Sequence, residues 1–212
     1  MHDFSIKNLA FVCGLSYTDK MTKLSDIKKR LRPGEVYRRQ DLARWSNAVD
    51  RHIKQLLVDG TLRKVAGGLY LHPKNTVFGD APPEDEKLVA GFLKDDRFLL
   101  ASPNAYNALG VGTTQLYDKT VVYNHKRHGE FSLGGRTFEF RVKPSLPKKL
   151  TREFLLVDLV NNIDRLAENE QEVLARVKEK ARSVDPARMR RAAEHYGKVR
   201  TKRLFAEALD AR

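Results

Sequence analysis

The sequence of 212 residues has one cysteine, Cys13, and no apolar run near the roughly 20 residues needed to cross a bilayer. A single cysteine excludes an internal disulfide and is typical of a reducing compartment. The apolar stretch at residues 9–15 follows an acidic Asp3 and lacks a clean cleavage site, so no signal peptide is predicted. We therefore expect a cytoplasmic protein with no membrane partner.

Clusters of catalytic or metal-binding residues are also missing. The six histidines are scattered, and the pair His125 and His128 falls in a predicted loop without a cysteine or paired carboxylates nearby. The glycines of Gly110-Val111-Gly112 lack the third glycine and the strand-to-helix context of a phosphate-binding loop. The sequence therefore predicts no enzyme, no metal and no cofactor.

What the sequence does have is positive charge, with 40 Lys and Arg against 27 Asp and Glu. Residues 1–72 contain 14 basic and 7 acidic side chains, residues 73–147 contain 10 and 9, and residues 148–212 contain 16 and 11. The excess lies at the two ends of the chain. Such an excess favours polyanionic partners, nucleic acid first among them.

The first seventy residues have the order of elements of a winged helix-turn-helix. A helix is predicted over residues 20–31 and a short one over 39–45, and a third over 48–58 has an apolar stripe at Val49, Ile53, Leu56 and Leu57. Two short strands at 61–65 and 69–72 follow, joined by a glycine turn. Trp45 is interpreted as packing between the helices.

In this kind of domain the third helix enters the major groove and the hairpin, or wing, contacts the flanking backbone. Arg51 suits guanine, Asn47 and Gln55 suit adenine, and Lys54 suits a base or a phosphate, while Asp50 either accepts from cytosine or orients Arg51. The predicted DNA-binding residues are Arg38, Arg39, Asn47, Asp50, Arg51, Lys54, Gln55, Arg63, Lys64, Gly67 and Gly68.

The rest of the chain predicts a second domain. Residues 74–83 are interpreted as a linker, and residues 84–212 as a mixed α/β domain that ends in a helical bundle. Strands are expected at 120–123, 129–133 and 136–142, with helices at 84–92, 103–109, 151–166, 171–181, 186–196 and 201–209. The predicted fold class is α+β, with an N-terminal extension at 1–17 and the DNA-binding domain at 18–73.

Basic residues of this second domain form a candidate surface for RNA or a protein partner, with a merely solvated helix surface as the alternative. They are Lys126, Arg127, Arg188, Arg190, Arg191, Lys198, Arg200, Lys202 and Arg203.

Several segments in order resemble the AbiEi-type antitoxin family. They are GEVYRRQDLA at 34–43, VDRHIKQL at 49–56, DGTLRK at 59–64, GGLYLHP at 67–73, SPNAYNALGV at 102–111 with Thr114-Gln115, and AEHYG at 193–197. The resemblance covers about residues 20–205, and residues 1–17 have no counterpart in it.

The resemblance implies an antitoxin of a toxin–antitoxin, or phage-defence, operon. The N-terminal domain would bind inverted repeats in its own promoter as a transcriptional repressor, with one chain or a homodimer on the DNA. The C-terminal domain, through the basic surface above, would neutralise a nucleotidyltransferase toxin, with or without a stable complex. An alternative is a winged-helix adaptor that binds protein or RNA, and a third hypothesis is a small nucleic-acid-acting enzyme.

Overall fold

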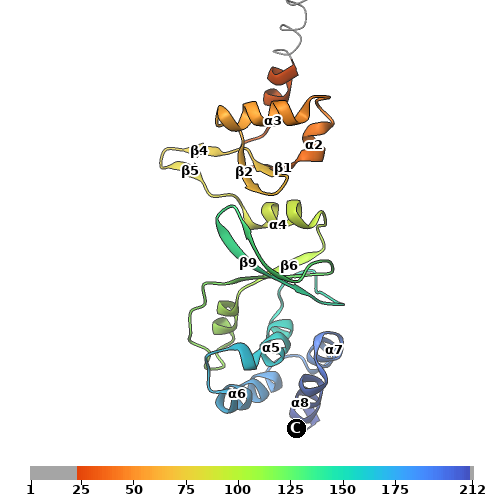
Figure 1. The fold of residues 1–212 in the computed structure, drawn as a ribbon. Helices are drawn as coiled ribbons and strands as arrows, with labels where there is room; N and C mark the ends of the chain where they lie inside the picture. The colour runs from red at the N-terminus through yellow and green to blue at the C-terminus, as the bar shows by residue number, and fades with distance from the viewer. Residues whose placement is uncertain (1–22, 211–212) are drawn as a thin grey trace, which may run out of the picture. The chain divides into compact units, whose positions relative to one another are not determined.

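A computed structural model describes residues 23–210. These residues divide into two compact units, one formed by residues 23–94 with 133–135 and the other by residues 95–132 with 136–210. Both contain helices and strands (Figure 1), so the chain has a mixed α and β fold. Cys13 and the N-terminal extension predicted at 1–17 lie outside the described residues.

Residues 23–30, the first that the structure describes, are helical; Ile27 is buried, as is Leu31 just beyond the end of the helix. Strand β1 (Val36–Arg38) leads directly into helix α2 (Arg39–Ala43), and α3 (Val49–Val58) follows. The predicted stripe on α3 is confirmed at Val49, Ile53 and Leu56, while Leu57 is half-buried. These side chains and those of the two preceding helices form one apolar cluster.

A three-stranded antiparallel sheet completes this part of the first unit. Strand β3 (Leu69–Leu71) lies between β1 and β2 (Arg63–Ala66), so the hairpin predicted in this stretch is confirmed. Val36 and Arg63 both pair with Leu71, and the register shifts between Lys64 and Ala66. The turn residue Gly68 adopts a left-handed φ of 68°, which glycine accepts without steric cost.

The segment predicted as a linker is a second hairpin. Strands β4 (Lys74–Thr76) and β5 (Gly79–Ala81) pair antiparallel, and the Thr76 hydroxyl donates to the Gly79 carbonyl at 2.7 Å. The prediction failed because these strands are short and almost fully exposed. They have no buried face and hence no alternation of apolar and polar residues to detect.

The predicted domain boundary is also wrong. Helix α4 (Asp85–Leu93) belongs to the first unit, where Gly91 lies against the side chains of Val36 and Leu69 and Lys87 forms an ion pair with Glu35 at 2.7 Å. The first unit therefore extends to Lys94. A glycine facing a strand gives no apolar signal in the sequence, so this packing could not be predicted.

The second unit contains a four-stranded mixed sheet in the order β6-β7-β9-β8. Strand β6 (Phe98–Ala101) pairs antiparallel with β7 (Thr120–Asn124), which pairs parallel with β9 (Arg136–Val142), and β8 (Gly129–Leu133) lies at the edge. The strands predicted at β7, β8 and β9 are confirmed, whereas β6 had not been predicted. The short helix η1 (Pro103–Leu109) connects β6 to the loop before β7, as predicted.

Helix α5 (Arg152–Asn161) lies between this sheet and the C-terminal helices (Figure 1). Its Phe154 packs with Leu99, Val121 and Tyr123 of the sheet, and its other apolar residues pack with the helices that follow. The single helix predicted over 151–166 is therefore divided, since α5 ends at Asn161 and the short helix η2 spans Ile163–Arg165.

The last three helices are α6 (Glu170–Arg182), α7 (Pro186–Tyr196) and α8 (Val199–Asp210), and each end lies within two residues of the predicted one. Local signals set the starts of α5 and α7. Thr151 caps α5 and Asp185 caps α7, each side chain accepting a backbone N–H, and Pro186 occupies the first turn of α7. No helix among residues 23–210 is long and apolar enough to span a membrane.

Candidate nucleic-acid interface

The polar side chains predicted to read DNA lie on the exposed face of α3 and of the residues just before it. Asn47, Asp50, Arg51, Lys54 and Gln55 are all exposed. The apolar stripe fixes this orientation, because residues three and four apart share one face of a helix and the opposite face must point to solvent. The helix starts at Val49 rather than Asn47, and the Ser46 hydroxyl accepts the Ala48 N–H at 3.0 Å.

Arg39 contacts two of the other predicted residues, Gly68 and Asp50. Its backbone N–H donates to the carbonyl of Gly68 at the tip of the β2–β3 hairpin, at 3.0 Å. Its guanidinium donates to both carboxylate oxygens of Asp50 on α3, at 2.7 and 2.6 Å. The start of α2, the start of α3 and the glycine turn are thus brought together.

This contact changes the role expected of Asp50. The prediction offered cytosine or Arg51 as its partner, whereas the structure pairs its carboxylate with Arg39. The guanidinium holds the pKa of Asp50 below its ordinary value, with the hydrogen bond as the main cause. The negative charge of Asp50 on the exposed face of α3 is therefore balanced by Arg39. Arg39 was predicted to bind a phosphate and instead forms this ion pair.

Arg38 also interacts with a neighbouring residue, Asp41. Its backbone N–H donates to the carboxylate of Asp41 at 3.0 Å and its side chain lies 3.4 Å from the same oxygen, so that the pair caps α2. On the hairpin, Arg63 and Lys64 are exposed, as are Gly67 and Gly68. Within residues 23–210, neither Arg51, Lys54, Arg63 nor Lys64 forms an ion pair with a carboxylate. These four are the cations that this surface offers to a ligand.

Beneath this surface lies a buried histidine. His52 is 2% exposed, and its Nδ1 lies 2.7 Å from the Ser46 hydroxyl. Burial lowers the pKa of His52, and the nearby charges of Arg51 and Lys23 lower it further. The imidazole is therefore held neutral, and its hydrogen bond fixes the turn between α2 and α3.

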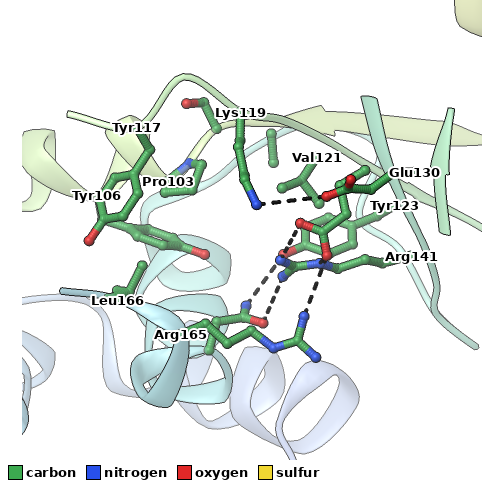
Figure 2. A pocket seen from close by; sticks show the side chains of 14 residues that line it. Pro103, Tyr106, Tyr117, Lys119, Val121, Tyr123, Glu130, Arg141, Arg165 and Leu166 are labelled. Atoms are coloured by element: carbon green, nitrogen blue, oxygen red, sulfur yellow. Dashed lines mark hydrogen bonds and ion pairs between the residues drawn. The ribbon is translucent and has the colours of Figure 1, made fainter. Parts of the chain in front are cut away.

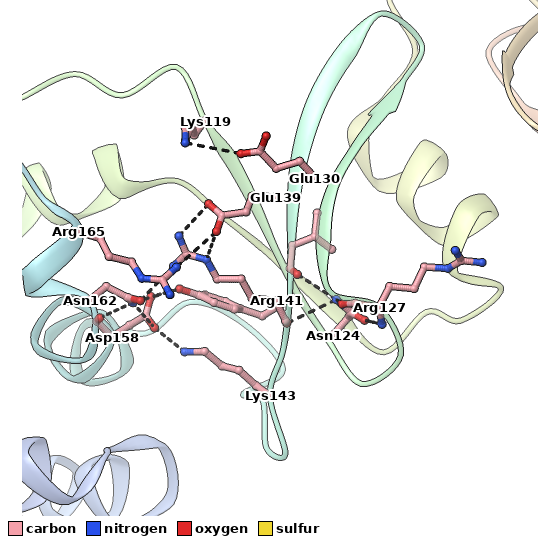
Figure 3. A network of polar contacts seen from close by, with 12 residues as sticks. Lys119, Asn124, Arg127, Glu130, Glu139, Arg141, Lys143, Asp158, Asn162 and Arg165 are labelled. Atoms are coloured by element: carbon pink, nitrogen blue, oxygen red, sulfur yellow. Dashed lines mark hydrogen bonds and ion pairs between the residues drawn. The ribbon is translucent and has the colours of Figure 1, made fainter.

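The second unit contains a buried polar network that sequence reasoning missed (Figure 3). The Asp158 carboxylate is inaccessible to solvent and accepts hydrogen bonds from Tyr106 at 2.8 Å, Tyr123 at 2.7 Å and Lys143 at 2.5 Å. Asn162, one turn along the chain, donates to the Asp158 carbonyl at 2.7 Å. Burial raises the pKa of both tyrosine hydroxyl groups, so they remain protonated donors.

The same network continues to the sheet. Arg141 donates to the side-chain oxygen of Asn162 at 3.0 Å and to both carboxylate oxygens of Glu139 at 2.7 and 2.8 Å. Arg165 lies 3.5 Å from the same Glu139 carboxylate. The only advance signal was the charged alternation Glu139-Phe140-Arg141 on β9, which is common on half-exposed strands.

A pocket of about 550 Å³ opens above this network (Figure 2). Tyr106, Tyr117, Pro103 and Leu166 line one side of it, and Lys119, Glu130, Arg141 and Arg165 lie on the other. Within residues 23–210 no group of three or more His, Cys, Asp or Glu is arranged to hold a metal ion.

Most of the basic residues predicted as a contact surface of the second unit are paired with carboxylates. Lys126 pairs with Asp95 at 2.9 Å, Arg190 with Asp210 at 2.7 Å, Lys202 with Glu194 at 2.8 Å and Arg203 with Glu207 at 3.8 Å, and Arg200 pairs with Glu170. Exposed ion pairs of this kind exchange partners at small cost. Arg127, Arg188, Arg191 and Lys198 are exposed, and the Nζ of Lys198 donates to the Asn161 carbonyl at 2.7 Å.

No family model and no curated protein matches the chain. Among solved structures there is a match in fold. The chain is similar to the RV2827C protein from Mycobacterium tuberculosis. The two share a TM-score of 0.55 and 15% identity over 89% of this chain and 75% of that one. At this identity the similarity concerns the fold alone, and it supports a mixed α and β architecture over most of the chain.

Proposed function

We propose that this protein binds DNA through a winged helix-turn-helix formed by its first unit. The observation that carries the proposal is the surface around α3, where polar side chains lie beside a glycine-tipped hairpin and Arg39 ties the two together. Asn, Gln and Arg side chains on such a helix can pair with base edges in the major groove. The order helix, strand, helix, helix and hairpin supports the winged-helix assignment.

Charge supports DNA over a protein partner for this surface. Arg51, Lys54, Arg63 and Lys64 form no ion pair within the described chain, and the one acidic residue of the α3 face is neutralised by Arg39. Phosphate contacts by such cations supply most of the non-specific affinity of a DNA-binding domain.

We further propose that the protein acts as an antitoxin that represses its own operon, as its resemblance to the AbiEi-type antitoxins implies. The first unit would bind inverted repeats in the promoter, and the second would neutralise a nucleotidyltransferase toxin. A groove between α7 and α8 supports a contact role for the second unit. It is lined by the apolar side chains of Phe205 and Leu209 and by charged residues, namely Arg190, Arg191, Lys202 and Glu194.

A mobility-shift assay with the DNA upstream of the gene tests the DNA-binding proposal. We expect a salt-sensitive shift, and Arg51→Ala and Lys64→Ala each to weaken it by about 1–3 kcal/mol. Arg203→Ala removes an exposed cation of α8 and serves as the matched control, which should bind as the wild type does. Equal binding by all three variants would show that α3 and the hairpin are not the interface.

Co-expression with the product of the neighbouring gene tests the antitoxin role. If that product is toxic, the full chain should restore growth while Arg51→Ala restores it equally, because neutralisation is assigned to the second unit. Growth arrest that the full chain does not relieve would favour the adaptor hypothesis.

A further inference from the structure

Two pockets of the second unit share a wall. The pocket described above, here called the tyrosine pocket, has a volume of about 550 Å³ and contains Tyr117. A second pocket of about 360 Å³, here called the basic pocket, lies beside it and contains Lys143 and Lys198. Arg141, Asn162 and Arg165 line both. Both volumes fall within the range of small-molecule sites.

The basic pocket is lined by cations and by no carboxylate. Its charged residues are Arg141, Lys143, Arg165 and Lys198, with the imidazoles of His128 and His195 beside them. The carboxylates of Asp158 and of Glu139, which lines the tyrosine pocket and not the basic one, match two of these four charges. Two positive charges are thus left for a ligand, which is the charge of one phosphate dianion.

The cations are held in place before any ligand arrives. Lys143 is fixed by Asp158 and lies 3.9 Å from the ring centre of Tyr123, and Lys198 is fixed by the Asn161 carbonyl. Arg141 is 15% exposed and bound on both edges. Donors that are already ordered lose little entropy on binding, so such a site favours anions more than flexible surface lysines do.

One wall of the tyrosine pocket is a loop that is also held by several hydrogen bonds. Residues 112–119 form no helix or strand, yet Asn104 bonds the N–H and the carbonyl of Tyr117, at 2.7 and 2.9 Å. The Tyr117 hydroxyl accepts the Ala167 N–H at 2.8 Å, and Glu168 accepts the N–H groups of Thr114 and Gln115. An irregular loop held at so many points presents a rigid aromatic ring to the pocket (Figure 2).

We propose that these adjoining pockets bind a nucleoside monophosphate, with the phosphate in the basic pocket and the base against Tyr117 in the tyrosine pocket. The shared guanidinium groups of Arg141 and Arg165 lie where the phosphate and the sugar of such a ligand would meet. A structural role in the buried network accounts for the positions of Asp158, Lys143 and Arg141. Arg165 and Lys198 also line the basic pocket, and both are exposed, although Arg165 pairs with Glu139 and Lys198 donates to the Asn161 carbonyl.

Calorimetric titration of the full chain with AMP, GMP, CMP and UMP tests the proposal. We expect saturable binding of at least one of them, weakened about tenfold or more by Arg165→Gln or by Lys198→Gln. Arg203→Gln lies outside both pockets and should leave the affinity unchanged. Tyr117→Leu should lower the affinity for the nucleotide. It should leave unchanged the affinity for inorganic phosphate, which we expect to be lower than that for the nucleotide.

Further titrations distinguish the possible sources of the ligand and define the results that would overturn the proposal. A short oligonucleotide that binds more tightly than any mononucleotide would identify a strand end as the natural source. Inorganic phosphate binding as tightly as the nucleotides would overturn the assignment, and so would the absence of saturable binding. Circular dichroism of each variant checks its fold, and Arg165→Gln and Lys198→Gln test the basic pocket independently. Arg51→Ala should bind the nucleotide normally, which separates this site from the DNA-binding surface.

Discussion

Arg39 and Asp50 are eleven residues apart and form a two-pronged ion pair between the starts of α2 and α3, with N–O distances of 2.7 and 2.6 Å. The same arginine bonds the turn of the hairpin through its backbone. One residue therefore positions both parts of the proposed DNA-binding surface relative to each other.

Breaking this pair should change DNA binding in opposite directions. Arg39→Ala leaves the Asp50 carboxylate unpaired beside the phosphates, so we expect weaker binding. Asp50→Ala removes that charge and frees Arg39, so we expect tighter and less selective binding, with a salt dependence steeper by about one phosphate contact. Fluorescence anisotropy on operator and scrambled DNA at several salt concentrations measures both, and Asp96→Ala is the control for loss of an exposed carboxylate. Weaker binding by both variants would assign Asp50 a direct contact with a base.

Acid should destabilise the first unit through His52. Its pKa is lowered by burial in the folded state, while in the unfolded chain it stays near 6.5. The unfolded state therefore binds the proton more readily, so the stability due to the neutral ring is present above pH 6.5 and is lost as the pH falls below that value. Thermal melting followed from neutral to mildly acidic pH should show a steeper loss for the wild type than for His52→Gln. Parallel curves for the two proteins would contradict this assignment.

Asp158 should be essential for the stability of the second unit. Asp158→Ala leaves Lys143 and two tyrosine hydroxyl groups without their acceptor in the core, which we expect to cost about 3–5 kcal/mol. Urea unfolding measures the loss, and Asp164→Ala, an exposed carboxylate on η2, is the matched control. The double variant Asp158→Ala with Lys143→Met should recover part of the loss because it removes the orphaned charge. A single variant as stable as the control would mean that water replaces the carboxylate.

Gly91 on α4 should resist substitution although it lies within a helix. Alanine is normally favoured there by about 1 kcal/mol. A Cβ at this position would lie 2.9 Å from Leu69 and 3.2 Å from Val36, and Leu69 is 2% exposed and cannot easily move. We expect Gly91→Ala to lower the free energy of unfolding by about 1–2 kcal/mol, as overpacking does. Gly67→Ala, which meets no atom within 4 Å, is the control, and a more stable Gly91→Ala would refute this packing of α4 on β1.

The elements themselves were largely readable from the sequence. The apolar spacing at Val49, Ile53 and Leu56 fixed the inner and outer faces of α3, and the caps at Thr151 and Asp185 fixed the starts of two helices. The exposed strands of the β4–β5 hairpin were missed because no periodicity marks a strand without a buried face. Strand β6, with four consecutive apolar residues, was missed because a short apolar run does not distinguish a strand from other buried segments.

The sequence by itself determined the positions of most helices and strands, the surplus of positive charge and the exposed face of α3, since each depends on residues close together in the chain. Only the tertiary structure decided that Asp50 meets Arg39, that α4 packs with the first unit, and that Asp158 receives Tyr106, Tyr123 and Lys143. The last three partners lie 15 to 52 residues from Asp158. Contacts of this range leave no periodic trace, because they are selected by the packing of whole elements rather than by local conformation.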